Sequence, residues 1–195
     1  MTGQANRGMT FEALIEQANR RYRLDGLAVI EKQHTLCKPL RGGDGRIHGA
    51  KYEEKATVDF MGRYGGRPIA FEAKHCSADR IDLKRVEEHQ CDFLRDWTAQ
   101  QGAIGFVIIS FGLDGFYLVP WAYWSAARTA RGLGCGMDVF DPGIGTVWRA
   151  TGKASIKREE LPHDWEIPTG GTAWLDYLAV VKRLWGAQEE RREEG

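Results

Sequence analysis

The chain has 195 residues, with 27 basic and 27 acidic side chains, so its formal net charge is zero and its pI is about 7.0. This length is typical of one domain with a substantial core, and the balanced charge argues against a protein that binds nucleic acid through overall positive charge alone. No segment has the pattern of a signal peptide or a membrane span, and the four cysteines form no C-x-x-C pair. We therefore expect a single cytoplasmic domain over residues 1–187 with reduced thiols, no zinc site and no membrane partner, followed by a disordered charged tail over 188–195.

The first predicted elements are a helix and a short strand. Thr10 is a good N-cap, and the apolar residues that follow it recur at helical spacing as far as Tyr22. Glu12 lies near the start of this helix, where an acid is also favoured by the helix dipole. Residues 27–31 form an apolar run that predicts the first core strand.

Residues 33–51 break this pattern. The segment is rich in glycine and has Asp44 as its one acid, so it cannot bury a core. Its basic residues include Lys38, Arg41, Arg46, His48 and Lys51. We expect a flexible excursion, which is either a solvated loop or a phosphate-binding loop, since neutralised phosphates release counterions.

Residues 57–74 predict a β-hairpin, with strands over 57–61 and 68–74 and a turn over 62–66. Because strand side chains alternate, Val58 and Ile69 would face the core while Asp59, Glu72 and Lys74 converge on the opposite face. Two carboxylates with a lysine at the rim suit Mg²⁺ and the hydrolysis of a phosphodiester. The alternative is a surface hairpin with an ordinary Glu/Lys pair.

The rest of the chain predicts helices alternating with strands. A helix over 79–100 presents Gln90 on its apolar stripe, where a buried amide requires a partner, either at the active site or on the backbone. Strands follow over 104–111 and 115–119, then helices over 121–131 and 172–185. This order predicts an α/β fold with a small mixed central sheet flanked by helices.

Asp59, the hairpin and Glu72-Ala73-Lys74 together resemble the D…(D/E)-x-K signature of the restriction-endonuclease-like nuclease superfamily. More specifically, the segments NRGMTFEALIEQAN, LAVIEK, KATVDFMGRYGGRPIAFEAK, EEHQCDFL and GFVIISF…FYLVPW resemble the RecU family of Holliday junction resolvases. The resemblance implies a homodimeric, Mg²⁺-dependent endonuclease, with Mn²⁺ as a substitute, that cuts two strands of a four-way DNA junction symmetrically. It also implies a restriction-endonuclease-like fold with a protruding basic stalk loop, here over about 33–52, that enters the junction centre.

Carried over by position, the resemblance assigns a role to each matching residue. Asp59 and Glu72 would hold the metal, with Thr57 lining the site. Lys74 would be the catalytic lysine, with Glu12 and Gln90 in support. The residues expected near DNA are Arg7 and Lys32, together with the stalk candidates Arg41, Arg46 and Lys51.

Two other functions remain open from the sequence. One is a sequence-specific or non-specific duplex endonuclease of the same fold, which would cut linear DNA. The other is a DNA-binding module without catalysis, which the presence of Asp59, Glu72 and Lys74 disfavours.

Overall fold

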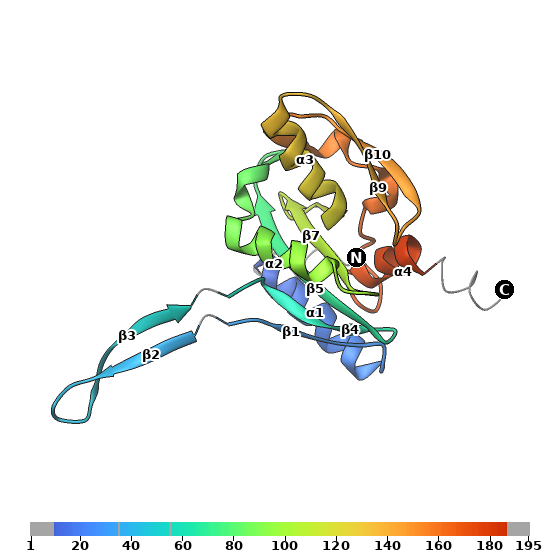
Figure 1. The fold of residues 1–195 in the computed structure, drawn as a ribbon. Helices are drawn as coiled ribbons and strands as arrows, with labels where there is room; N and C mark the ends of the chain where they lie inside the picture. Colours follow the sequence, from blue (N-terminus) through green and yellow to red (C-terminus); the bar gives the residue numbers. More distant parts are fainter. Residues whose placement is uncertain (1–9, 35, 55, 187–195) are drawn as a thin grey trace.

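The computed structural model describes residues 10–34, 36–54 and 56–186, and its core is a five-stranded mixed sheet (Figure 1). The strand order is β1-β4-β5-β7-β8, and all neighbours are antiparallel except β5 and β7. The strands span Ala28–Lys32 (β1), Phe60–Tyr64 (β4), Arg67–Cys76 (β5), Ile104–Phe111 (β7) and Gly115–Pro120 (β8). The expected α/β class with a mixed sheet between helices is confirmed.

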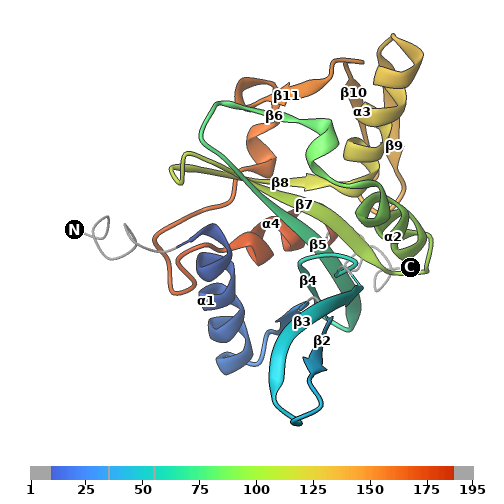
Figure 2. The same cartoon turned by 90° about the vertical axis from the view of Figure 1, so that its left-hand side faces the viewer.

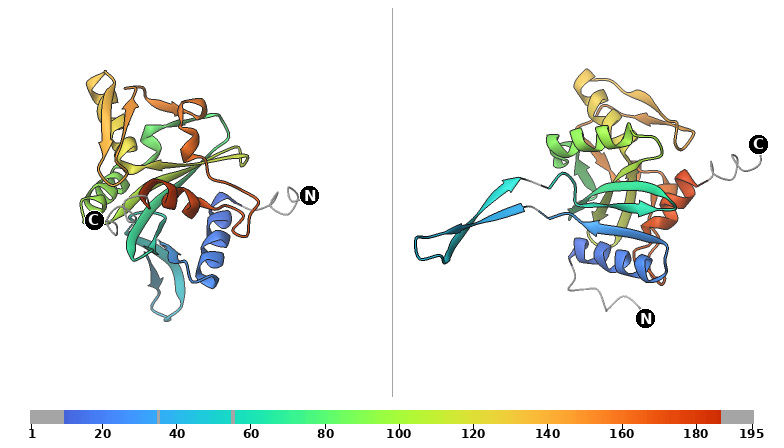
Figure 3. Two further views of the ribbon diagram at one scale, coloured as in Figure 1. Left: turned by 90° about the vertical axis from the view of Figure 1, so that its right-hand side faces the viewer. Right: turned by 60° about the horizontal axis from the view of Figure 1, so that its bottom comes forward.

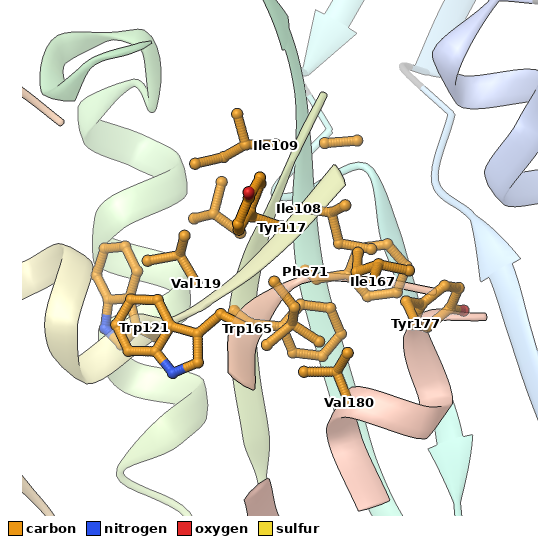
Figure 4. Close-up of a cluster of buried hydrophobic side chains, with 14 of the residues drawn as sticks. Phe71, Ile108, Ile109, Tyr117, Val119, Trp121, Trp165, Ile167, Tyr177 and Val180 are labelled. Carbon is orange, nitrogen blue, oxygen red and sulfur yellow. The ribbon is translucent and has the colours of Figure 1, made fainter. Parts of the chain in front are cut away.

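Helices α1 (Phe11–Leu24) and α4 (Tyr177–Trp185) cover one face of the sheet (Figure 2). Thr10 caps α1 as expected, because its Oγ1 accepts a hydrogen bond from Ala13 N at 3.3 Å. On the sheet, Phe71 stacks between Phe60 and Phe106, with ring centroids 5.0 and 4.7 Å apart. Figure 4 shows Tyr177 of α4 packed beside Phe71, so aromatic side chains form the centre of this core layer.

The opposite face is covered by α2 (Glu88–Thr98) and α3 (Trp121–Leu133). Helix α3 ends at Gly134 with φ 68°, two residues beyond the expected stop at Gly132. A hairpin of β9 (Met137–Asp141) and β10 (Thr146–Ala150), which we did not predict from the sequence, packs on α3. All eight residues of β7 are buried, as expected for a strand covered on both faces. In the part of the chain that the structure describes, no helix has the length and apolar character of a membrane span.

The segment predicted as a flexible loop is a β-hairpin, with register shifts at Leu36/Cys37 and Leu40/Arg41. Strands β2 (Leu36–Arg41) and β3 (Ile47–Glu54) pair with each other antiparallel and project from the body of the molecule (Figures 1 and 3). We call β2, β3 and their turn the stalk. The projection is confirmed, but the prediction of irregular structure is wrong, because local pairing satisfies the backbone groups of an exposed segment without a core.

The hairpin of β4 and β5 differs from the prediction in the position of its turn. Strand β4 continues through Gly62, and the turn consists of Gly65 and Gly66, whose φ values of 54° and 76° suit a two-residue hairpin connection. Gly62 lies opposite Ile30 of β1, and a Cβ there would be 2.0 Å from the Val29 carbonyl oxygen. This glycine therefore permits close strand packing and does not form the turn.

The helix predicted over 79–100 begins later than expected. Its first part is β6 (Arg80–Asp82), followed by the short helix η1 (Leu83–Arg85). Strand β6 pairs with β11 (Ser155–Lys157), a partner more than 70 residues away, as the register Ile81 with Ile156 shows. Long-range pairing overrides the local helical spacing here. The chain then passes η2 (Arg158–Glu160) and η3 (His163–Trp165) before α4, which starts at Tyr177 because Asp176 caps it.

We expect Gly62→Ala to lower the free energy of unfolding by about 1–3 kcal/mol, because a methyl group would push β1 away from β4. Urea denaturation measures this loss. The matched control is Gly43→Ala in the stalk, where a Cβ would meet open space. We expect this variant to change the free energy of unfolding by less than about 0.5 kcal/mol. Equal stability of the two variants would contradict the close β1–β4 packing.

Candidate active site

The segment 57–59 carries Asp59 to the start of β4, beside Glu72 on β5. The register pairs Phe60 with Phe71, so the residues before and after this pair are neighbours. Asp59 N donates a hydrogen bond to Glu72 Oε2 at 3.1 Å, and Ala73 N donates to Asp59 Oδ2 at 2.9 Å. The Asp59 carbonyl oxygen accepts from Gln33 N at 2.7 Å. Backbone groups on both sides therefore hold Asp59 in place.

Glu72 is the centre of the site. Its side chain is 1% exposed, yet it carries a carboxylate in the middle of a sheet. Lys74 Nζ and Gln90 Nε2 both lie 2.6 Å from Glu72 Oε1. With the Asp59 N–H on the other oxygen, the buried carboxylate accepts three hydrogen bonds, as a buried acid requires. The predicted convergence of Asp59, Glu72 and Lys74 on the face opposite Phe71 is observed, and their catalytic roles stay predictions.

Gln90 is the partner that α2 contributes to this cluster. It is buried, its amide nitrogen donates to Glu72, and its Oε1 accepts from Glu87 N at 2.9 Å. The Glu87 bond is one half of a capping box at the start of α2, and it orients the amide. Of the two partners foreseen for this amide, the structure supplies both. We did not predict Glu87 as a partner of Gln90. The spacing Glu87-x-x-Gln90 before an apolar helix is typical of a capping box and would have indicated this contact.

Burial and charge repulsion act together on Glu72. Removal from water disfavours its charged form most, and the neighbouring Asp59 carboxylate adds to this, while Lys74 opposes both. The sum raises the pKa of Glu72 to about 8. A cation bound beside Glu72 would favour its charged form and oppose this rise.

The donor set fits a hard divalent cation. Asp59 and Glu72 present carboxylate oxygens, and within residues 10–34, 36–54 and 56–186 no group of three or more His, Cys, Asp or Glu could hold a metal. An ion bound here would depend on water or substrate oxygens to complete its shell, which is the usual state of Mg²⁺ and not of structural zinc.

Other predicted site residues lie apart from this cluster. Thr57 is exposed, and no hydrogen bond among the described residues joins its side chain to Asp59 or Glu72. Glu12 Oε2 lies 2.6 Å from Lys32 Nζ, and Glu16 Oε1 lies 3.3 Å from the same atom. The hydrogen bond that Lys32 donates to Glu12 raises the pKa of Lys32, so this cation is already neutralised by acids of α1.

The predicted DNA-binding residues are only partly described. Arg7 lies outside the described residues, as does the side chain of Lys51, whose backbone belongs to β3. Arg41 and Arg46 are exposed on the stalk, and Arg41 Nη1 donates to the Gly45 carbonyl at 3.1 Å. The stalk therefore displays two arginines to solvent.

We expect the metal-free protein to lose stability as the pH rises from about 4.5 to about 8. Over this window the folded state keeps the proton on Glu72 and the unfolded state releases it, so the free energy of unfolding falls with pH. Thermal unfolding in chelator at several pH values measures the slope. Glu72→Gln should flatten it and the control Glu16→Gln should not; an identical slope in Glu72→Gln would contradict the raised pKa.

The sequence of this chain is similar to the sequences of known proteins. The family model described as RecU, Recombination protein U, matches residues 6–132. The Holliday junction resolvase RecU of Bacillus pumilus is 32% identical over 191 residues, covering 92% of this chain and 82% of the relative. The enzyme of the same name from Geobacillus kaustophilus is 29% identical, covering 93% and 86%.

Among solved structures, a similar one is Archaeoglobus fulgidus Hjc, a Holliday junction resolvase, at 14% identity and a TM-score of 0.35 over 56% of this chain and 72% of that one. The sequence matches span most of the chain, including the segment that carries Asp59, Glu72, Lys74 and Gln90. The chain belongs to the RecU family.

Proposed function

We propose that this protein is a metal-dependent endonuclease that resolves four-way DNA junctions. The observation that carries the proposal is the buried Glu72 carboxylate, held by the Asp59 N–H, Lys74 and Gln90. The shared name of the curated relatives, Holliday junction resolvase, supports the choice of substrate. The proposal includes the restriction-endonuclease-like fold and its chemistry, the hydrolysis of a phosphodiester.

Asp59 and Glu72 would hold Mg²⁺, with Mn²⁺ as a substitute. When bound, such an ion supplies Lewis acidity toward a phosphate oxygen and lowers the pKa of a water. Lys74 is half-buried and shares an oxygen of Glu72, so it places a positive charge where negative charge grows on the phosphate. Gln90 acts through Glu72 as a positioning residue, because its amide fixes the carboxylate oxygen that Lys74 also contacts.

The remaining site residues keep supporting roles in the proposal. Thr57 precedes Asp59 on the exposed approach to the metal site. Glu12 and Lys32 form an ion pair at the end of β1, and the backbone of Gln33 joins this strand end to Asp59 at 2.7 Å. If Lys32 moved toward a DNA phosphate, Glu12 would lose this partner and become free to approach the metal site. The ion pair would then connect DNA binding with Asp59 and Glu72. Arg7, which lies outside the described residues, is proposed to contact DNA.

Junction selectivity is assigned to symmetry and to the stalk. A two-fold homodimer would present two active sites at a fixed separation, which matches the two equivalent strands of a junction. The stalk would enter the junction centre, with Arg41, Arg46 and Lys51 on its phosphates. Recognition would then follow DNA shape more than base sequence.

We expect Asp59→Asn to reduce cleavage by about 100-fold or more, the scale on which one group of a preorganised site acts. DNA binding should persist, because the amide oxygen can still accept from Ala73 N. The assay compares a four-way junction with linear duplex, in Mg²⁺ or chelator, and Asp96→Asn on the surface of α2 is the control.

Paired, Mg²⁺-dependent nicks confined to the junction and lost in Asp59→Asn would support a resolvase. Equal cutting of the duplex would move the function to a general endonuclease of the same fold. Full activity of Asp59→Asn would contradict the metal site.

We expect replacement of Arg41, Arg46 and Lys51 by glutamine to weaken junction binding and to lower the slope of log affinity against log salt by up to about 2.7, or 0.9 per lost phosphate contact. Binding in chelator, followed over a salt series, measures both effects. The control replaces three exposed basic residues away from the stalk, Arg149, Lys182 and Arg183. Unchanged affinity in the stalk variant would remove the stalk from the model of DNA binding.

A further inference from the structure

Strand β5 continues beyond Lys74 and leads into an open cavity. His75 and Cys76 at the end of the strand line this cavity, which has a volume of about 620 Å³. Arg80 on β6 and Arg85 on η1 form further walls. In Figure 2 the stalk lies at the bottom and the β6–β11 pair at the top, with β5 running between them. The cavity is therefore on the side of the active site away from the stalk.

The cavity has two uncompensated positive charges. Neither Arg80 nor Arg85 forms an ion pair or hydrogen bond within residues 10–34, 36–54 and 56–186. The acid that lines the same cavity, Asp82, accepts from Lys84 N at 3.1 Å and is paired with Lys84 Nζ at 3.6 Å. A nearby arginine, Arg158, contrasts with both, since it is paired with acids. The net charge of the cavity walls is positive.

A second observation points to an anion at the same place. The β6–β11 register sets Arg80 directly opposite Lys157. Like charges directly opposite on neighbouring strands destabilise a sheet, and here the ladder has only three residue pairs to offset the cost. Lys157 is partly compensated by Glu159 at 2.9 Å, whereas Arg80 is not. An anionic group bound beside Arg80 would remove this repulsion.

The distance along β5 suits one particular anion. Successive strand residues rise about 3.3 Å, so Cys76 lies about 7 Å beyond Lys74. A DNA strand that follows β5 would present a phosphate about every 3.4 Å along its axis, so the phosphates next to the cleavage point would reach the cavity. Arginine suits this contact, because its planar fork binds phosphate oxygens in pairs.

We propose that Arg80 and Arg85 bind backbone phosphates of the strand being cut, on the side of the scissile bond away from the stalk. This inference rests on the proposed function and adds a second anchor to it. With the stalk at the junction centre on one side and the Arg80/Arg85 cavity on the other, the strand would be held on both sides of Asp59, Glu72 and Lys74. The anchor positions the scissile phosphate and reads no base.

The test compares Arg80→Gln/Arg85→Gln with Lys182→Gln/Arg183→Gln, a pair of equal charge on the exposed side of α4. Junction binding is measured in chelator over a salt series, and thermal unfolding verifies that each variant is folded. We expect the cavity variant to bind roughly 10-fold or more weakly, with a salt slope lowered by about 1.8, and the α4 variant to match wild type.

Neutral methylphosphonate linkages then locate the contact. Placed one at a time beside the cleavage point, they should weaken wild-type binding on one side and add no further loss in Arg80→Gln/Arg85→Gln. A cavity variant with wild-type affinity and salt slope, or an equal loss in the α4 variant, would overturn the inference while leaving junction cleavage by wild type intact. A wild-type protein that neither binds nor cuts junctions would overturn the proposed function and this inference together.

Discussion

A buried carboxylate in the middle of a sheet is the constraint that the rest of this structure serves. Glu72 cannot be hydrated where it lies, so its carboxyl oxygens have to be met by donors that the fold brings to them. Those donors come from three elements: the approach to β4 supplies Asp59 N–H, β5 supplies Lys74, and α2 supplies Gln90. Removing any of them leaves an acid with fewer partners in a low-dielectric place. The same arrangement would be poor for stability alone, and this is the physical ground for proposing an active site here.

The aromatic layer on the other face of the sheet makes this arrangement rigid. Phe71 precedes Glu72 in β5, so the stacking that holds Phe71 between Phe60 and Phe106 also fixes the direction in which Glu72 points. A slip of one residue between β4 and β5 would turn the carboxylate into the aromatic core. Register, core packing and active-site geometry are therefore one property of this hairpin.

The sequence predicted the site well where period-two alternation and a short hairpin were enough, as for Asp59, Glu72 and Lys74. The prediction that Gly62 belongs to the turn was wrong, because the neighbouring sequence does not indicate that the backbone of β1 packs against this residue. The prediction was also wrong about residues 80–82, whose partner strand lies at 155–157, since local spacing carries no record of a distant pairing. The pairing of Glu12 with Lys32 could not be anticipated either, because it depends on how α1 crosses the end of β1.

The stalk pairs only with itself, and this has a consequence for how the family can vary. Because β2 bonds to β3 and to no other strand in the described chain, residues of the stalk contribute little to the stability of the body. Substitutions in the stalk therefore affect its contacts with other molecules more than they affect the stability of the fold. The stalk can therefore vary in sequence at less cost to folding than the central sheet, so exchanging stalks between relatives would show whether substrate preference moves with the stalk while the sheet stays unchanged.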